Sequence, residues 1–468
     1  MLTRSLFLGN LQKSREKLLK LIKKAFFLEK IEKIRFRLMS ENNKVIHFAK
    51  TIWRGKEIKF GIKLKNRKSH IYIIGKTGTG KSTLLLNMMV ADILAGNGFC
   101  LIEPHGDLSE EILNFVPKER IKDVIYFNAS DLDYPIGFNP LEKSNSESSF
   151  LIASSLISIF KKIWYEFWGP RLEYILRNSL LTLLEYEGST LLDLQRLLTN
   201  KEFRKKIIEK IKDIELKQFW LSEFEKYPSF LKTEAISAIL NKVGQFLTNL
   251  PIRLIIGQRK SSFDLKEIMD QGKILIVNLS KGKIGEDTAK LLGSMLISKT
   301  EFSALRRAEI EEEKRKTFYF YIDEFQNFLT LSLADILPEA RKYGLSLILS
   351  HQYLEQLDEK IREAIFGNVG TIISFRVGSS SAKYLAKEFS PNLSETDLVN
   401  LPNYHIYLKL MIDGKTSQGF SAITLPPPKR GISYKEEIIK HSRTKYGRKR
   451  EEVEKEIFYS LSHKHFIK

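Results

Sequence analysis

The chain has 468 residues and a formal net charge of +20, and it contains a single cysteine, Cys100. Its length is enough for two or three domains, and one cysteine excludes an intramolecular disulfide and favours a reducing compartment. No run approaches the roughly 20 apolar residues that cross a bilayer, and the N-terminus lacks the apolar core of a secretory signal. We therefore expect a cytoplasmic protein.

The positive charge lies at the two ends of the chain. Residues 1–70 contain 20 Lys and Arg against 5 Asp and Glu, residues 429–468 contain 12 against 6, and the 358 residues between them contain 44 against 45. Basic ends can bind the phosphates of nucleic acid through counterion release, or they can bind an anionic membrane surface. Both partners remain open at this point, as do ends that are merely solvated.

The first segment, residues 1–44, is predicted to form a basic amphipathic helix or helix pair. From Lys13 to Leu38, apolar residues recur at helical spacing among lysines and arginines. Such a face could dock on a membrane, on a partner or on the protein's own core. Residues 45–143 are assigned to the first part of a nucleotide-binding domain, and that part opens with a strand-rich stretch from Val45 to Leu64.

A glycine-rich octapeptide, GKTGTGKS, lies between the β-type run 71–74 and the helix-type run 83–95. The order strand, loop, helix is typical of a phosphate-binding loop, whose glycines bring backbone N–H groups up to phosphate oxygens. Lys81 would contact the β and γ phosphates, and the Ser82 hydroxyl would bind Mg²⁺. We predict ATP and Mg²⁺ as ligands, with nucleotide contacts from Gly75, Lys76, Thr77, Gly78, Thr79, Gly80, Lys81, Ser82 and Thr83.

The next buried strand is predicted from Phe99 to Ile102, and its carboxyl end carries a polar cluster. In an open parallel sheet that end faces the ligand. Glu103 and Asp107 are therefore candidates for outer contacts with Mg²⁺ or for coupling to DNA. A turn-forming role for this cluster is equally open.

The spacing of apolar residues changes between residues 144 and 261. Apolar residues there recur at spacings of three and four, which predicts an inserted all-helical domain. Strand-type runs return at 274–278, 318–322, 346–350 and 371–375, with helices between them. This alternation predicts an α/β fold with a mostly parallel sheet. Residues 262–428 would form the second part of the nucleotide-binding domain, and residues 429–468 a basic C-terminal tail.

Two adjacent acids, Asp323 and Glu324, end the apolar strand FYFYI. Burying two carboxylates at the ligand edge of a sheet is costly unless a cation meets them. We predict that Asp323 holds Mg²⁺ through water and that Glu324 orients the water that attacks the γ phosphate.

The following strand ends in His351 and Gln352. An amide at this position could sense the γ phosphate, whereas His351 is predicted to pack or to donate a hydrogen bond. Charge on the γ phosphate in the transition state calls for an arginine, often from a neighbouring subunit. Arg341 and Arg376 are the candidates, and either could instead form an ordinary salt bridge.

At this point the chain resembles the conjugative coupling proteins of type IV secretion, the TraD/TraG type, within the HerA/FtsK group of DNA pumps. The resemblance covers roughly residues 48–428. It is carried by the segments HIYIIGKTGTGKSTL, EPHGDL, FNPLE, WGPRLEYILRNSLLTLLE, LNKVGQFL, VNLSKGKIGED, YIDEFQNF, EARKYGLSLILSHQYLEQL and GNVGTIISFRVG.

The resemblance implies a RecA-like P-loop ATPase with an all-helical insertion, hexameric around DNA, that moves DNA toward a membrane channel. By position it assigns Lys81 and Ser82 to nucleotide and Mg²⁺, Asp323 and Glu324 to the acidic pair, Gln352 to the γ-phosphate sensor and Arg341 to the arginine acting in trans. A relaxase and an inner-membrane secretion channel are implied partners. The segment 168–171, WGPR, would pack within the insertion or guide DNA.

Two departures from the family qualify these expectations. Glu103 stands where many relatives have aspartate, and the chain offers a basic amphipathic stretch where many coupling proteins have membrane helices. Membrane attachment would then be peripheral, at the inner face of the cell membrane, or through a partner. Two alternatives remain: a HerA-like helicase or translocase in repair or chromosome processing, and a secretion ATPase that acts on protein.

Overall fold

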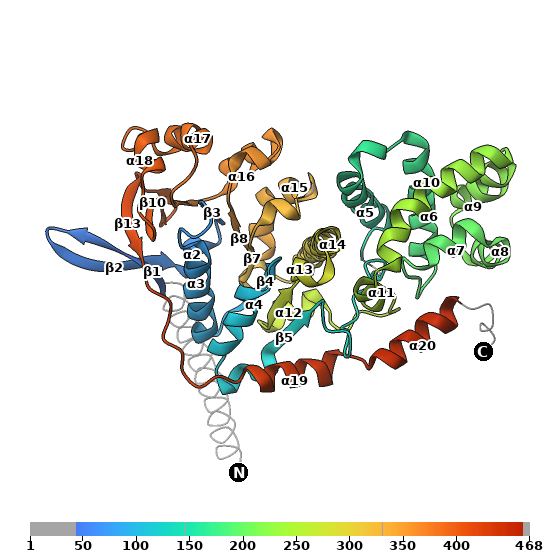
Figure 1. Ribbon diagram of the computed structural model, residues 1–468, viewed down its shortest axis with the longest axis horizontal. Helices are drawn as coiled ribbons and strands as arrows, with labels where there is room; N and C mark the ends of the chain where they lie inside the picture. Colours follow the sequence, from blue (N-terminus) through green and yellow to red (C-terminus); the bar gives the residue numbers. More distant parts are fainter. Residues whose placement is uncertain (1–43, 145, 330, 462–468) are drawn as a thin grey trace, which may run out of the picture.

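A computed structural model describes residues 44–461, apart from 145 and 330. This part of the chain combines a large sheet, covered by helices on both faces, with a helical insertion at one side (Figure 1). The amphipathic helix expected within residues 1–44 lies outside the described residues. Among the described helices, none has the length and apolar character required to cross a bilayer.

The described residues form one eleven-stranded sheet with the strand order β2-β1-β13-β10-β9-β3-β8-β7-β4-β6-β5. From β9 to β5 all neighbours are parallel, and the four strands at the other side pair antiparallel. The predicted mostly parallel α/β sheet is therefore confirmed. The strands are β1 (Val45–Trp53), β2 (Lys56–Lys63), β3 (Ile71–Ile74), β4 (Gly98–Glu103), β5 (Val124–Asn128), β6 (Ile274–Asn278), β7 (Phe318–Ile322), β8 (Leu345–His351), β9 (Thr371–Ser374), β10 (His405–Lys409) and β13 (Phe420–Thr424).

The parallel strands are buried on both faces, which explains their nearly unbroken apolar sequences. Alternate residues enter different cores: Ile71 and Ile73 pack on one side of the sheet, and Tyr72 and Ile74 on the other. The first face is covered by α3 (Lys81–Ala95), α4 (Asp107–Ile112) and α19 (Lys435–Tyr446). The second is covered by α12 (Leu265–Gln271), α14 (Glu286–Leu305), α15 (Leu331–Ala340), α16 (Glu359–Asn368) and α17 (Ser379–Phe389).

Between β5 and β6 the chain leaves the sheet and forms the helical insertion, drawn in teal to green in Figure 1. Trp220, fully buried at its centre, donates a 2.8 Å hydrogen bond to Thr182. In the WGPR segment, Pro170 begins α6 and the Trp168 indole donates to Glu173 at 2.7 Å. The insertion consists of α5 (Ser149–Ile163), α6 (Pro170–Glu185), α7 (Asp193–Thr199), α8 (Lys201–Lys210), α9 (Ile214–Gln218), α10 (Ser229–Thr248) and α11 (Leu250–Ile256).

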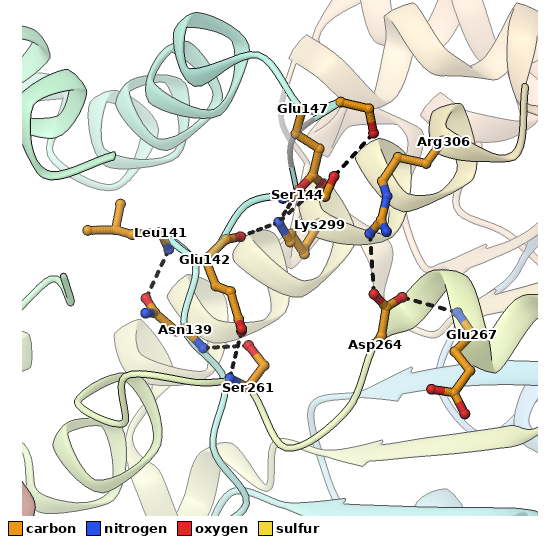
Figure 2. A network of polar contacts seen from close by, with 11 residues as sticks. Asn139, Leu141, Glu142, Ser144, Glu147, Ser261, Asp264, Glu267, Lys299 and Arg306 are labelled. Atoms are coloured by element: carbon orange, nitrogen blue, oxygen red, sulfur yellow. Dashed lines mark hydrogen bonds and ion pairs between the residues drawn. The ribbon is translucent and has the colours of Figure 1, made fainter. Parts of the chain in front are cut away.

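The two chain crossings into the insertion are tied to each other and to the sheet domain (Figure 2). The Lys299 ammonium of α14 donates to the Glu142 carbonyl at 2.5 Å and to the Glu147 carboxylate at 3.1 Å. The Glu142 carboxylate in turn accepts from the Ser261 amide of the returning chain at 2.7 Å. A movement of the insertion at this junction would therefore be transmitted to α14.

The region after the proline run at 426–428 is also folded. α19 lies along the outer edge of β5, where Ser442 Oγ accepts from the Tyr126 amide at 3.0 Å and donates to the Val124 carbonyl at 3.4 Å. These bonds replace part of the missing ladder of an edge strand. The next helix, α20 (Arg450–Leu461), packs on α11, so the segment expected to be a basic tail runs from the sheet to the insertion (Figure 1).

The remaining short elements join these layers. They are α2 (Leu64–Arg67), α13 (Lys281–Ile284), α18 (Glu395–Val399) and the small hairpin of β11 (Met411–Ile412) and β12 (Lys415–Thr416).

Candidate nucleotide site

The phosphate loop occupies the turn between β3 and α3, as its sequence predicts. Gly78 and Gly80 have φ angles of 76° and 118°, in the left-handed region that side chains other than glycine rarely adopt. A Cβ on Gly80 would also lie 2.8 Å from the Tyr404 ring. The helix that follows begins at Lys81, so its N-terminal N–H groups point into the loop.

The loop opens into a cavity of about 670 Å³. Residues from the loop, from the tips of β4, β7 and β8, and from α3 and α4 meet there. The lining residues are Thr77, Gly78, Gly80, Lys81, Ser82, Thr83, Leu86, Glu103, His105, Asp107, Leu108, Glu111, Asp323, Glu324, Gln352 and Tyr404. Of the predicted site residues, Gly75, Lys76 and Thr79 do not line this cavity, and it brings together Thr77, Gly78, Gly80, Lys81, Ser82, Thr83, Asp323, Glu324 and Gln352.

Lys81 lies curled over its own loop. Its ammonium donates to the Gly75 carbonyl at 2.6 Å and to the Lys76 carbonyl at 3.3 Å. Burial lowers the Lys81 pKa, and the nearby carboxylates of Glu324 and Asp323 oppose that shift. The charge is therefore held at the cavity by carbonyl oxygens that a phosphate could replace.

The acidic pair follows β7 directly, at the end of the sheet that carries the loop. Burial is the main reason why the pKa of Asp323 is raised to about 7, and the charge of Glu324 adds to it. A carboxylate with this environment is stabilised when a cation arrives beside it. Glu324 has φ 48° and ψ 45°, a left-handed conformation that is uncommon for glutamate.

The left-handed turn places the Glu324 carboxylate between two amides. Gln352 Nε2 donates to Oε1 at 2.7 Å, and Gln326 Nε2 donates to Oε2 at 2.6 Å. Thr77 of the loop donates in turn to Gln352 Oε1 at 3.0 Å. Gln352 therefore connects the phosphate loop to Glu324, and its role as a γ-phosphate sensor stays a prediction.

His351, the neighbour of Gln352, has a packing role. Its ring is fully buried against Tyr72 and Phe325, and its Nε2 is hydrogen-bonded to the Tyr72 hydroxyl. Burial lowers the pKa of His351 to about 3, so the ring is neutral at physiological pH.

Glu103 shapes a turn. Its carboxylate accepts from the amides of His105 and Gly106, both at 2.6 Å, and from the Ser109 hydroxyl at 3.1 Å. Burial raises the pKa of Glu103. Of the two alternatives for this cluster, the contacts favour turn formation at Glu103, while Asp107 lies exposed at the cavity wall.

The two candidate arginines are placed differently. Arg341 is exposed just before β8 begins, and Gln352 lies just past the other end of that strand. The Arg376 guanidinium donates to the Leu401 carbonyl at 3.1 Å and to Asn403 Oδ1 at 2.9 Å. Neither arginine lines the nucleotide cavity of its own chain.

Tyr404 and Gln326 are residues of the site that sequence reasoning missed. Tyr404 lines the cavity, has φ 67° and donates its backbone N–H to the Thr79 carbonyl at 2.8 Å. Nothing in its sequence surroundings marks it. Gln326 carries a signal that could have been used, because it is a polar residue within the aromatic run FQNF and lies two positions after Glu324.

The comparisons with known proteins agree with this geometry. Residues 59–412 match the family model of the type IV secretion-system coupling protein DNA-binding domain. The curated type 4 coupling protein DotL of Legionella pneumophila is 24% identical over 357 residues, which is 63% of this chain and 45% of DotL. The chain thus spans less than half the length of this relative.

Among solved structures, the bacterial conjugative coupling protein TrwBdeltaN70 is similar with a TM-score of 0.59 and 16% identity, over 84% of this chain and 92% of that one. TrwB in complex with ADP and Mg²⁺ gives a TM-score of 0.58 with 17% identity over the same shares. VirB4 of Thermoanaerobacter pseudethanolicus gives a TM-score of 0.54 with 14% identity, over 84% of this chain and 99% of that one. By its match over three quarters of its length, the chain belongs to the type IV secretion-system coupling protein family.

Proposed function

We propose that the chain is an ATP-dependent DNA translocase that couples nucleotide hydrolysis to DNA transfer in conjugative type IV secretion. One observation carries the proposal: the phosphate loop, the acidic pair and the sensor amide line a single cavity. The helical insertion, the match to a DNA-binding coupling family and the basic chain ends support DNA as the cargo.

The residues present fit ATP with Mg²⁺. The glycines leave room where a Cβ at Gly80 would collide with Tyr404, and Asp323 offers a buried carboxylate near the Ser82 hydroxyl, since both line the same cavity. Asp323 would hold the metal through water and Ser82 directly. When bound, the metal supplies charge that neutralises the β and γ phosphate oxygens.

Three side chains of this site would carry out the remaining steps of hydrolysis. Lys81 exchanges its carbonyl partners, Gly75 and Lys76, for phosphate oxygens. Gln352 reports an arriving γ phosphate because its amide already bridges Thr77 and Glu324. Glu324 then orients the attacking water and accepts its proton.

The site is incomplete within one subunit because neither Arg341 nor Arg376 reaches it. An arginine from a neighbour would complete it, and head-to-tail contacts of this kind close into rings. We propose a homo-hexamer in which Arg341 acts in trans. It is the better candidate because Arg376 is already engaged by Leu401 and Asn403.

The remaining partners follow from the same proposal. An inner-membrane secretion channel would receive the DNA and a relaxase would deliver it. The basic ends would bind DNA phosphates or would hold the protein peripherally at an anionic membrane.

ATP turnover measured with and without single-stranded and duplex DNA, across a salt titration, tests this function. We expect DNA to stimulate turnover and the stimulation to weaken steeply with salt, because phosphate contacts release counterions. Turnover that ignores DNA but rises with a channel subunit or anionic vesicles would favour a secretion ATPase that acts on protein. DNA stimulation together with a nuclease as partner would favour a HerA-like role in repair.

A further inference from the structure

Gln326 links the nucleotide site to the helical insertion. It lies in the short 3₁₀ turn Phe325–Asn327 and is half-buried. On one side its amide donates a 2.6 Å hydrogen bond to Glu324 Oε2. On the other side it lines a second cavity of about 350 Å³, whose other walls come from α5 of the insertion, from α14 and from Gln356.

The segment that carries Gln326 is fastened to both of these helices. Lys162 at the end of α5 donates to the Leu329 carbonyl at 2.5 Å, and Ser294 of α14 donates to the Phe328 carbonyl at 3.3 Å. At Gly293 the backbone lies so close that a Cβ would come within 2.3 Å of the Phe328 ring. A shift of α5 or α14 must therefore move residues 325–329.

In this arrangement each oxygen of the Glu324 carboxylate accepts a hydrogen bond from a side-chain amide. Gln352 occupies Oε1 and Gln326 occupies Oε2, at 2.7 and 2.6 Å. Each oxygen keeps a second lone pair, but the two donors together fix the orientation of the carboxylate, so that a water can approach it only from the directions that they leave open. Gln352 is tied to the phosphate loop through Thr77, whereas the segment that carries Gln326 is tied to α5 and α14.

We propose that Gln326 is a positioning residue that restrains Glu324 until the helical insertion moves. Cargo bound to the insertion would shift α5, withdraw the Gln326 amide and let the Glu324 carboxylate turn toward the attacking water. This inference rests on the proposed function, since it assigns Glu324 to proton acceptance, and it adds the route by which DNA stimulates hydrolysis.

The restraint is tested with Gln326→Met, which keeps the length of the side chain but removes the donor. Losing a hydrogen bond to a charged group is expected to raise the DNA-free turnover number about fivefold or more. The KM for ATP should stay at the wild-type value, and the ratio of DNA-stimulated to DNA-free turnover should fall by the same factor. Gln356→Met is the matched control: it removes an exposed amide from the same cavity and should leave the rate and the ratio unchanged.

A second variant acts at the other end of the link. Lys162→Met detaches α5 from the Leu329 carbonyl and should change the ratio in the same direction as Gln326→Met. The double variant should show no additional change, because both substitutions interrupt one connection.

The outcomes separate this inference from the proposed function. If wild-type protein does not hydrolyse ATP, or if DNA does not stimulate it, the proposed function fails. If wild-type protein is stimulated by DNA but Gln326→Met keeps the wild-type ratio, or loses DNA-free turnover, the restraint is overturned and the function stands. The restraint is also overturned if Lys162→Met and Gln326→Met change the ratio in opposite directions.

Discussion

The amide of Gln352 donates a 2.7 Å hydrogen bond to the carboxylate of Glu324 across the ends of two adjacent parallel strands, β8 and β7. The oxygen of the same amide, Gln352 Oε1, accepts a hydrogen bond from the Thr77 hydroxyl of the phosphate loop. A change at the loop can therefore reach the proposed water-activating carboxylate through one side chain. Such a path needs only side-chain rotation and leaves the strands in register.

Replacing Glu324 by glutamine is expected to reduce the turnover number by about 100-fold or more, the usual contribution of a general base. Glutamine keeps the shape of the side chain but cannot accept the proton of the attacking water. Binding of a fluorescent ATP analogue should persist because the loop is unchanged. Multiple-turnover hydrolysis and a binding titration on the same preparation check this. Wild-type turnover in the variant would remove Glu324 from the assigned role.

Replacing Lys81 by alanine is expected to weaken ATP binding by about 10- to 100-fold, because charge-assisted contacts to phosphate contribute about 1.5–3 kcal/mol. Lys76→Ala offers a matched control within the same loop, since it keeps the backbone N–H predicted to contact the nucleotide and removes only a side chain that does not line the cavity. Its affinity should stay near the wild-type value. Equal losses in the two variants would argue that the loop responds to overall charge.

Mixing two inactive variants tests the arginine in trans. Lys81→Ala protein lacks a working phosphate loop but keeps Arg341. Arg341→Ala protein keeps the phosphate loop but lacks the arginine. Random mixing in a ring would place an intact phosphate loop beside an intact Arg341 of the neighbouring subunit at about a quarter of the interfaces. Hydrolysis should therefore reappear when the two are mixed. If it does not, while each variant still forms rings by light scattering, Arg341 has no role across the interface.

The sheet and the site differ in how far the sequence could predict them. Parallel strands buried on both faces leave long apolar runs, so Ile274–Asn278 and Phe318–Ile322 were recognisable with correct bounds. Because the carboxyl ends of such strands share an edge, Asp323, Glu324 and Gln352 were expected to meet.

Contacts that depend on one unusual torsion or on distant chain could not be predicted in this way. The Gln326 contact exists because Glu324 is left-handed, with φ 48°. The contact of α19 with the edge of β5 depends on Ser442, which lies 316 residues along the chain from its hydrogen-bond partner Tyr126. No periodicity encodes either relationship, and the same holds for the approach of Tyr404 to the phosphate loop.

A buried ion pair should make the sheet domain sensitive to one arginine. The Arg67 guanidinium makes two bonds to Asp92, at 2.6 and 2.9 Å, and one to the Tyr321 hydroxyl at 2.7 Å, with both charged side chains fully buried. Arg67→Met would leave the Asp92 charge without its partner, which costs about 3–5 kcal/mol of unfolding free energy.

Equilibrium unfolding in urea measures this cost, and two variants calibrate it. Arg67→Met combined with Asp92→Asn should be less destabilised than Arg67→Met alone, because no buried charge is left unpaired. Lys314→Met, which removes the exposed pair with Glu311, should unfold like the wild type. A double variant as unstable as Arg67→Met would mean that lost packing causes the effect.

Stability should fall in mild acid because of His70. Its Nδ1 accepts from the Leu347 amide and its Nε2 lies 3.0 Å from the Leu337 carbonyl, an arrangement that only the neutral ring satisfies. Burial lowers its pKa from 6.5 to about 4. Below about pH 6.5, His70 therefore binds a proton in the unfolded chain but stays neutral in the folded chain until the pH approaches 4. The stability that depends on the neutral ring is complete above that pH and is lost as the pH falls toward 4.

The expected slope from this one group approaches about 1.4 kcal/mol of unfolding free energy per pH unit between pH 6 and 4.5. His70→Asn removes the titration and retains a side chain that tolerates the left-handed backbone at this position, φ 58°. Its unfolding free energy should be lower at pH 7 but should depend less on pH. His47→Asn, at an exposed position of β1, is the control and should keep the wild-type slope. If His70→Asn also keeps that slope, another group causes the acid sensitivity, and His351, with a pKa of about 3, is the next one to replace.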